Sequence, residues 1–377
     1  MAISLDLLQN NVPTLADKVL FVAVGQGGGN IGIELQNLGY TVFYVNTSHR
    51  DLETLYDKDG NEVAANRKYH FAGEDGCNKD RTKAKLLAKS HSLRLSKIIA
   101  DRFSDFTNIC FVYSMGGGSG SGITPILMKI LSNFEELEDK VLMSMAIVPN
   151  KKEPPKVKIN AVECFNDFVT LYKSNVISSS LWVSNPEFSN GSNKLEFNRE
   201  VAYDVHRILN ISSKDVRGTI DQYEALDQLG IRGAINIGDI IKGRKGDRDR
   251  FEVSYCFEQA YGAAQSIVYS LTDETDYIRK IMENSYGEVE IPLVGYRDDD
   301  MGSYAVVYGL PIPSDVFDEY HQDYKDYRRK QEQHKTLETS VRSIDIDIPI
   351  NNPRKQRAKT KAINTTADLD DLFSDLL

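Results

Sequence analysis

The chain has 377 residues, of which 41% are hydrophobic, and its formal net charge at pH 7 is −10. This length is enough for two domains with cores of their own, and no apolar run approaches a membrane span, which excludes a helical membrane protein. The negative charge excludes broad binding of nucleic acid by the folded body, although a local basic segment could still bind it. Four scattered cysteines without metal-ligand spacing, and a start without a signal segment, favour the cytoplasm and no membrane partner.

Apolar runs alternate with helical patterns through about the first 210 residues. The predicted strands span residues 19–24, 41–45, 109–113, 141–148 and 180–184. This alternation is typical of a parallel sheet with helices on both faces, which binds its ligands at the carboxyl ends of the strands. We therefore expect an α/β fold with an N-terminal, Rossmann-like nucleotide-binding domain.

The later part of the chain predicts a second, smaller α/β domain. A central helix is expected from Lys214 to Ile231, followed by strands near 250–256, 288–296 and 303–309 and one helix at 257–272. A long charged helix is expected from Ser314 to Glu338, and the polar residues after it are expected to be disordered. The predicted parts are residues 1–212 (nucleotide-binding domain), 213–238 (central helix and the loop after it), 239–312 (C-terminal domain), 313–339 (C-terminal helix) and 340–377 (flexible tail).

Two glycine-rich turns follow two of the predicted strands. One runs from Gly25 to Asn30 after the strand at 19–24, and the other from Gly116 to Gly122 after the strand at 109–113. Glycine lets the backbone approach a ligand closely, and a helix that follows adds the positive end of its dipole. Glycine-rich turns also occur without a ligand, but two of them, each closing a buried strand, predict a nucleotide bound from two sides.

Two other nucleotide-binding motifs fit less well. The first turn nearly matches G-x-G-x-x-G, but Asn30 replaces the last glycine. A dinucleotide fold would also place an acidic residue at the end of the next strand, where this chain has Asn46, Thr47 and Ser48. No G-x-x-x-x-G-K-[ST] sequence occurs, so a P-loop is excluded.

The two turns resemble the first glycine loop and the signature loop of the tubulin/FtsZ superfamily, whose signature usually reads G-G-G-T-G-[ST]-G. Ser119 stands where threonine is commoner and keeps the hydroxyl group. The order of elements also agrees with this family over residues 18 to 315. The resemblance implies a GTPase that binds GTP or GDP with Mg²⁺ and polymerises head to tail, so that the chain is its own partner.

The resemblance also implies roles for individual residues. The candidate nucleotide-binding residues are Gly25, Gln26, Gly27, Gly28 and Asn30 in the first loop, Asn46 and Thr47 in the second, Gly73, Glu74, Asp75 and Gly76 in the third, Gly116, Gly117, Gly118, Ser119, Gly120 and Ser121 in the signature loop, and Glu153, Asn185 and Asn198 near the ribose and base. Gln26, Glu74 and Asp75 are the candidates for holding Mg²⁺ through water. Helix capping is the alternative for the two carboxylates, and a solvated loop is the alternative for Glu153. An Asn amide suits guanine because it both donates and accepts, but guanine specificity is implied by the resemblance alone.

Hydrolysis in this family requires two subunits. The loop after the central helix reaches the nucleotide of the next subunit and delivers carboxylates that polarise the attacking water, which implies hydrolysis stimulated by assembly. Asn236-Ile237-Gly238-Asp239 is expected at that loop, although FtsZ would read N-x-D-x-x-D, and glycine and isoleucine fall here where acids should be. Asp239 is the catalytic candidate, with Asn236 in support, and an N-cap role is the alternative for Asp239.

The tail distinguishes branches of the family. A basic run from Arg354 to Lys361 precedes an acidic end from Ala367 to Leu377, whose leucines and phenylalanine follow helical spacing. This end is predicted to dock to a partner, with a solubilising tail as the alternative. The tail and the mixed glycine loops resemble the TubZ branch, plasmid- and phage-encoded tubulins that segregate DNA through a DNA-bound, TubR-like adaptor contacting the C-terminal region. The alternatives are an FtsZ-like cell-division or phage-spindle filament and a non-polymerising nucleotide-binding regulator.

Overall fold

The computed structural model describes residues 15–71, 75–186, 193–211, 216–218, 220–243, 250–254, 264–272, 276–289, 292–297 and 302–338. The chain divides into two units, residues 1–330 and 331–377. Among the described residues, no helix is apolar over a length that would cross a bilayer.

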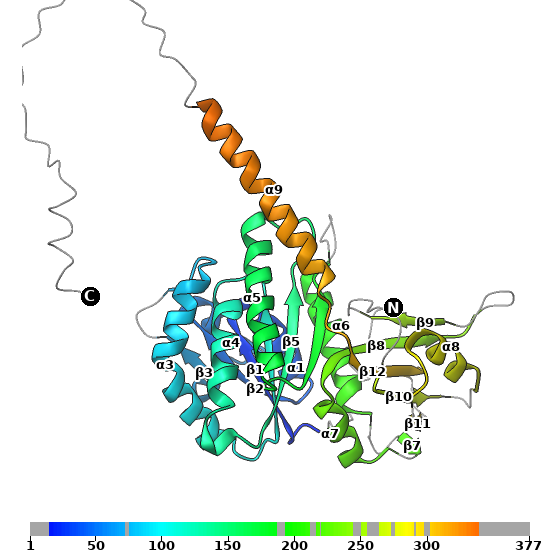
Figure 1. Cartoon of the computed structure of the whole chain (residues 1–377). Helices are drawn as coiled ribbons and strands as arrows, with labels where there is room; N and C mark the ends of the chain where they lie inside the picture. The colour runs from blue at the N-terminus through cyan, green and yellow to red at the C-terminus, as the bar shows by residue number, and fades with distance from the viewer. Residues whose placement is uncertain are drawn as a thin grey trace, which may run out of the picture. The chain divides into compact units, whose positions relative to one another are not determined.

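One mixed sheet runs through the first unit (Figure 1). Its strand order is β3-β2-β1-β4-β5-β6-β8-β12-β10-β11-β7, and β9 pairs with β8 beside this path. The strands are β1 (Val19–Val24), β2 (Thr41–Asn46), β3 (Lys68–His70), β4 (Asn108–Ser114), β5 (Val141–Val148), β6 (Ser179–Ser184), β7 (Val216–Gly218), β8 (Gly233–Ile241), β9 (Arg250–Val253), β10 (Ser266–Leu271), β11 (Leu293–Arg297) and β12 (Tyr304–Leu310).

The first half of the sheet is parallel, and its strands are buried on both faces. Leu20, Val22 and Val24 of β1 point into one hydrophobic core, while Val19, Phe21 and Ala23 point into the other. A strand that is buried on both faces reads as a continuous apolar run, which is why these strands could be predicted from the sequence. The five predicted strands and the Rossmann-like parallel sheet are confirmed.

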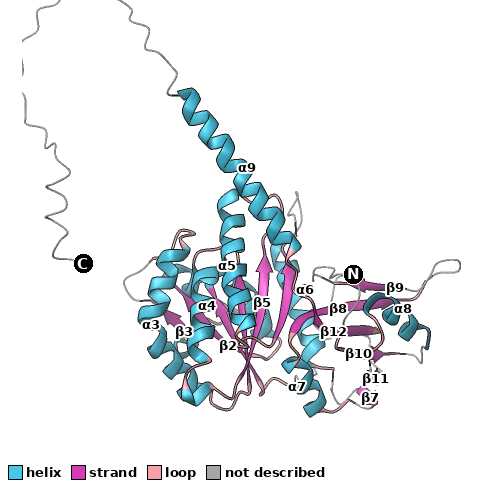
Figure 2. Ribbon diagram, viewed as in Figure 1, coloured by secondary structure: helices cyan, strands magenta, loops and turns pink. Residues whose placement is uncertain are grey.

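Helices cover both faces of the sheet, as the colouring by secondary structure shows (Figure 2). Those of one core are α3 (Arg81–Arg102), α4 (Ser119–Leu131), α5 (Pro155–Lys173), α8 (Asp276–Tyr286) and α9 (Asp315–Glu338), and those of the other are α1 (Gly25–Asn37), α2 (His49–Glu53), α6 (Lys194–Leu209) and α7 (Gln222–Gly230). The predicted long late helix is confirmed as α9. It is anchored by Phe317, whose ring stacks on that of Phe165 with the centroids 4.1 Å apart.

The predicted central helix from Lys214 to Ile231 is confirmed only over Gln222–Gly230 and is wrong over Val216–Gly218. Val216–Gly218 form β7, which pairs antiparallel with β11, and the helix α7 begins only at Gln222. Asp221 caps α7, because its side chain accepts the amide of Glu224 while the Glu224 side chain accepts the amide of Asp221. This reciprocal capping box defines the start of the helix, and the described residues Val216–Gly218 before it are not helical.

The predicted helix at 257–272 is also wrong over the part that the structure describes. Ser266–Leu271 form β10, which lies between β11 and β12, while residues 255–263 lie outside the described residues. Ile267, Tyr269 and Leu271 point into one core and Val268 into the other, so this is another strand that is buried on both faces. Its apolar run was too short to be told from a buried helix by periodicity alone.

The sheet continues without a break between the predicted domains. β8 pairs in parallel with β6 and antiparallel with β12, so one strand joins the two halves. The first five parallel strands therefore belong to the same continuous sheet as the later strands of the first unit.

Candidate functional site

Five parallel strands end along one edge of the sheet. The register pairs Val24 of β1 with Val45 of β2 and Tyr113 of β4, and it pairs Val148 of β5 with Ser184 of β6. The chain leaves β1 toward β2 on one side and reaches β4 on the other, so β1 and β4 flank the point where the strand order reverses. Open α/β sheets bind their ligands at this switch point, and both glycine turns lie there.

The two glycine turns pack directly on each other. A side-chain Cβ at Gly25, which has φ +72°, would lie 2.9 Å from the amide nitrogen of Gly120. A Cβ at Gly120 would lie 3.0 Å from the carbonyl oxygen of Val24. Helix α1 begins at Gly25 and α4 at Ser119, so much of what was expected to be loop is the first turn of a helix. Two helix N-termini, whose first amides have no partner within their own helix, therefore meet at the switch point.

Several of these glycines serve the packing of the protein itself. A Cβ at Gly28 would overlap the carbonyl oxygen of Val112, and one at Gly118 would lie 3.0 Å from the Lys79 backbone. Gly117 differs, because the nearest atom to a Cβ there is the Ser114 carbonyl oxygen at 3.9 Å. Gly117 therefore borders open space. In the other glycine turn, the side chains of Gln26 and Asn30 are exposed.

The predicted second and third loops meet the signature loop at Thr47. The buried Thr47 hydroxyl lies 2.7 Å from the Ser119 hydroxyl, and the Thr47 carbonyl accepts the Gly76 amide at 2.9 Å. Asn46 is occupied within its own turn, since its side-chain oxygen accepts the Ser48 amide at 3.1 Å. The structure thus brings four predicted residues together: Asn46, Thr47, Gly76 and Ser119.

The remaining predicted binding residues lie at the same edge or on α6. Asn185 directly follows β6, and its backbone amide donates to the Val148 carbonyl at 2.9 Å. Glu153 closes a turn, because its backbone amide donates to the Asn150 carbonyl at 3.1 Å. Asn198 is buried in α6, whose Arg199 lies 3.6 Å from Glu34 of α1. Gly73 and Glu74 lie outside the described residues, and Asp75 is exposed.

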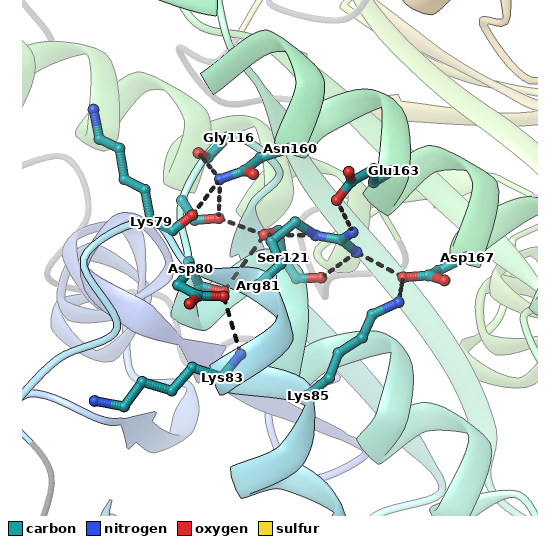
Figure 3. A network of polar contacts seen from close by, with 12 residues as sticks. Lys79, Asp80, Arg81, Lys83, Lys85, Gly116, Ser121, Asn160, Glu163 and Asp167 are labelled. Atoms are coloured by element: carbon teal, nitrogen blue, oxygen red, sulfur yellow. Dashed lines mark hydrogen bonds and ion pairs between the residues drawn. The ribbon is translucent and has the colours of Figure 1, made fainter. Parts of the chain in front are cut away.

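A buried polar network lies behind the signature loop (Figure 3). The Arg81 guanidinium donates to the Ser121 hydroxyl and carbonyl, both at 3.1 Å, and pairs with Glu163 at 2.9 Å and Asp167 at 2.6 Å. The Asn160 amide lies 2.9 Å from the Lys79 carbonyl oxygen and 3.2 Å from that of Gly116. Sequence reasoning missed both residues. One signal was available, because Arg81 stands in the first turn of a helix, where a positive charge opposes the helix dipole.

Asn236 and Asp239 were placed in a loop, and that placement is wrong. Both lie in β8, where Asn236 pairs with Val307 and Asp239 with Tyr304 of β12. The alternative placement of Asp239 at a helix N-cap is wrong for the same reason. Asn236 is buried.

Asp239 has a partner within the chain. Its carboxylate pairs with the buried guanidinium of Arg207, which also donates to Asp204 at 3.0 Å and lies over the Tyr304 ring at 4.3 Å. Burial raises the pKa of Asp204 to about 6, although the Arg207 charge opposes the shift. The ion pair with Arg207 favours a structural role for Asp239.

Comparisons with known proteins agree with this geometry. Residues 18–179 match the model of the "Tubulin/FtsZ family, GTPase domain", and this range includes both glycine turns and the polar network behind them. This part of the chain therefore resembles a tubulin/FtsZ GTPase domain.

Relatives and solved structures extend the likeness. The tubulin-like protein TubZ of Clostridium botulinum C phage is 28% identical over 212 residues, which are 56% of this chain and 56% of that protein. A tubulin-like CetZ of Pyrococcus furiosus is 25% identical over 199 residues, covering 51% of this chain and 49% of CetZ. The chain thus spans about half the length of these curated relatives.

Solved TubZ structures have the same fold. The tail-truncated TubZ of Clostridium botulinum phage c-st superposes with a TM-score of 0.69 at 22% identity, covering 84% of this chain and 99% of that one. A GTPγS-form protofilament of Bacillus thuringiensis serovar israelensis TubZ superposes with a TM-score of 0.70 at 14% identity, covering 88% and 98%. The tubulin-like fold therefore extends beyond residues 18–179 into the second half of the sheet.

Whether the residues at this site could hold Mg²⁺ depends on how many protein ligands the ion needs. The described residues contain no group of three or more His, Cys, Asp or Glu side chains that could hold a metal ion. Mg²⁺ bound to a nucleotide takes most of its ligands from phosphate and water and needs only one or two protein groups. The exposed Gln26 at the first turn and Asp75 beside Gly76 have the oxygen donors for that limited part.

Alanine substitutions at two glycines of these turns separate an effect on packing from an effect on ligand binding. The free energy of unfolding of Gly117→Ala, measured in urea, is expected to lie within about 0.5 kcal/mol of the wild-type value, because the added Cβ meets no close atom. The same substitution is expected to weaken nucleotide binding about tenfold, because the methyl group enters the open side of the turn. Fluorescence titration with a labelled nucleotide measures the affinity.

Gly28→Ala is the matched control. Its Cβ would overlap the Val112 carbonyl, so the free energy of unfolding should fall by about 3 kcal/mol. Wild-type affinity in Gly117→Ala would show that no ligand occupies the space beside Gly117.

Proposed function

We propose that the chain binds GTP, assembles head to tail into filaments and hydrolyses GTP where two subunits meet. The observation that carries this proposal is the pair of helix N-termini packed at the switch point of a domain that resembles the tubulin/FtsZ GTPase domain. Similarity to TubZ supports assembly, because solved TubZ structures are described as protofilaments and as a two-stranded filament.

The residues at the switch point have distinct parts in this proposal. The amides of the two glycine turns bind the phosphates, assisted by the positive ends of both helix dipoles. The Thr47 and Ser119 hydroxyls, 2.7 Å apart, join the second loop to the signature loop at the phosphates. Asn198 and Asn185 are the candidates for the base and Glu153 for the ribose. Mg²⁺, when bound, would neutralise phosphate charge, and Gln26, Asp75 and Glu74 are the candidates for holding it through water.

The hydrolytic acid belongs to a different segment from the one first expected. The resemblance assigns it to the loop after the central helix, and the long helix that lies beside α1 is α6. The segment between α6 and the short helix α7 comprises residues 210–221 and includes β7. Asp221 is the exposed, described carboxylate at its end, while Asp215 lies outside the described residues. We therefore assign the acid to this segment and test Asp221 against Asp239.

Similarity to TubZ also supports a role in DNA segregation. The basic run and acidic end of the tail, residues 340–377, provide two chemically different docking segments for a DNA-bound, TubR-like adaptor. DNA is then moved indirectly, through the adaptor, in the cytoplasm.

Hydrolysis and light scattering, measured together across a series of protein concentrations with GTP and Mg²⁺, test the GTPase proposal. Turnover is expected only above a critical concentration, because the acid that completes the site of one subunit comes from the neighbouring subunit. Asp221→Asn should assemble but hydrolyse at least about a hundredfold more slowly, since asparagine keeps the helix cap and removes the charge. Asp239→Asn is the matched control and should keep most of its turnover per assembled subunit.

Other outcomes would redirect the proposal. Slow turnover in Asp239→Asn alone would restore Asp239 as the catalytic acid. Turnover independent of concentration would contradict hydrolysis at subunit contacts, and no assembly at any concentration would support the non-polymerising regulator.

Deletion of residues 353–377 tests the segregation proposal. The shortened chain is expected to assemble normally. Cells that make it should nevertheless lose a plasmid carrying its gene and the flanking DNA as fast as cells that make a variant unable to assemble. Sedimentation measures assembly, and plasmid retention over generations measures segregation. Full retention with the shortened chain would contradict adaptor docking at the tail.

A further inference from the structure

We infer that Arg81 and Asn160 are positioning residues, which hold the signature loop from behind and orient its amides toward the phosphates; this inference rests on the proposed function. Neither residue belongs to the glycine turns. Arg81 comes from α3 and Asn160 from α5, so two helices far apart in the sequence converge on one loop (Figure 3).

Asn160 holds the carbonyl side of the loop. Its side chain has no exposed surface, and its amide nitrogen lies 3.2 Å and 3.3 Å from the carbonyl oxygens of Gly116 and Gly117. A trans peptide points its C=O and the next N–H in opposite directions. Turning these two carbonyls toward Asn160 therefore turns the amides of Gly117 and Gly118 to the other side of the loop.

Arg81 acts on the same carbonyl through Ser121. Its Nε donates to the Ser121 hydroxyl at 3.1 Å, and this hydroxyl donates to the Gly117 carbonyl. The second arm of the guanidinium donates to the Ser121 carbonyl at 3.1 Å. A planar fork that engages both groups of one residue limits rotation of the Ser121 hydroxyl, which a single ammonium group cannot do.

The ion pairs explain how a buried cation is kept at this place. Arg81 is only 4% exposed and stands at the start of α3, where the helix dipole disfavours a positive charge. Glu163 and Asp167, both from α5, supply the compensating charges, and Lys85 shares Asp167 at 2.6 Å. The network therefore joins α3, the signature loop at the start of α4, and α5 into one rigid support.

The orientation of the loop matters because it changes the sign of its interaction with phosphate. An amide that faces a phosphate oxygen donates a hydrogen bond, whereas a carbonyl in the same place repels it. A flip of a peptide plane by about 180° within Gly116–Ser119 would exchange one for the other. Residues that hold the carbonyls back thus determine affinity for the phosphates without touching them.

Variants of the full chain test the inference through two ligands. Asn160→Asp keeps the size of the side chain but replaces its donor by an acceptor that faces the same carbonyls. Its affinity for GTP is expected to fall at least about tenfold, while its affinity for guanosine, which lacks phosphates, stays within about twofold. Arg81→Gln should behave in the same way, and Arg81→Lys should fall between it and the wild type. Displacement of a fluorescent GTP analogue measures both affinities.

Lys85→Gln is the matched control, because Lys85 pairs with Asp167 on the outer side of the network. It should keep the wild-type ratio of GTP to guanosine affinity. Equal losses for GTP and guanosine in the Asn160 and Arg81 variants would show a general structural effect and overturn the inference, as would an unchanged ratio. If an Arg81 variant does not fold, Asn160→Asp decides, and Asn160→Ala, which removes the donor without adding charge, decides if that also fails. A wild-type chain that binds no GTP would instead contradict the proposed function.

Discussion

The close approach of two glycine turns is the constraint on which the rest of the structure depends. Val24 and Ser114, the last residues of two adjacent parallel strands, present backbone oxygens to Gly120, with room for no side chain between them. This contact brings the starts of α1 and α4 together at the switch point. It also requires support from behind, because a run of glycines has little conformational preference of its own. Arg81, Asn160 and Thr47 provide that support from three different elements.

The sequence predicted the part of the fold in which local patterns and burial agree. The strands β1, β2, β4, β5 and β6 are buried on both faces, so each reads as an apolar run, and the glycine turns follow two of them directly. The family resemblance added the second loop, and the structure places Thr47 within hydrogen-bond distance of Ser119. The catalytic assignments, the base contacts and the role of the tail remain predictions.

The errors arose where distant partners decide the local structure. Val216–Gly218 form a strand because they pair with β11. Ser266–Leu271 form a strand because they pair with β11 on one side and β12 on the other. The placement of Asn236–Asp239 in a loop failed for the same reason, since β12 pairs with that segment. Arg81 and Asn160 could not be found from a motif, because their partners lie 40 and 44 residues away, on the signature loop. Their importance follows from burial and geometry, which only the fold supplies.

Amide hydrogen exchange with and without GDP tests the central claim most directly. If one nucleotide binds to both turns, GDP should slow exchange in residues 24–30 and in residues 115–121 together, with the same dependence on GDP concentration. Exchange in the first turn of α9 should not change. Protection of only one turn, or of neither, would contradict the claim that the two glycine turns form a single phosphate-binding site.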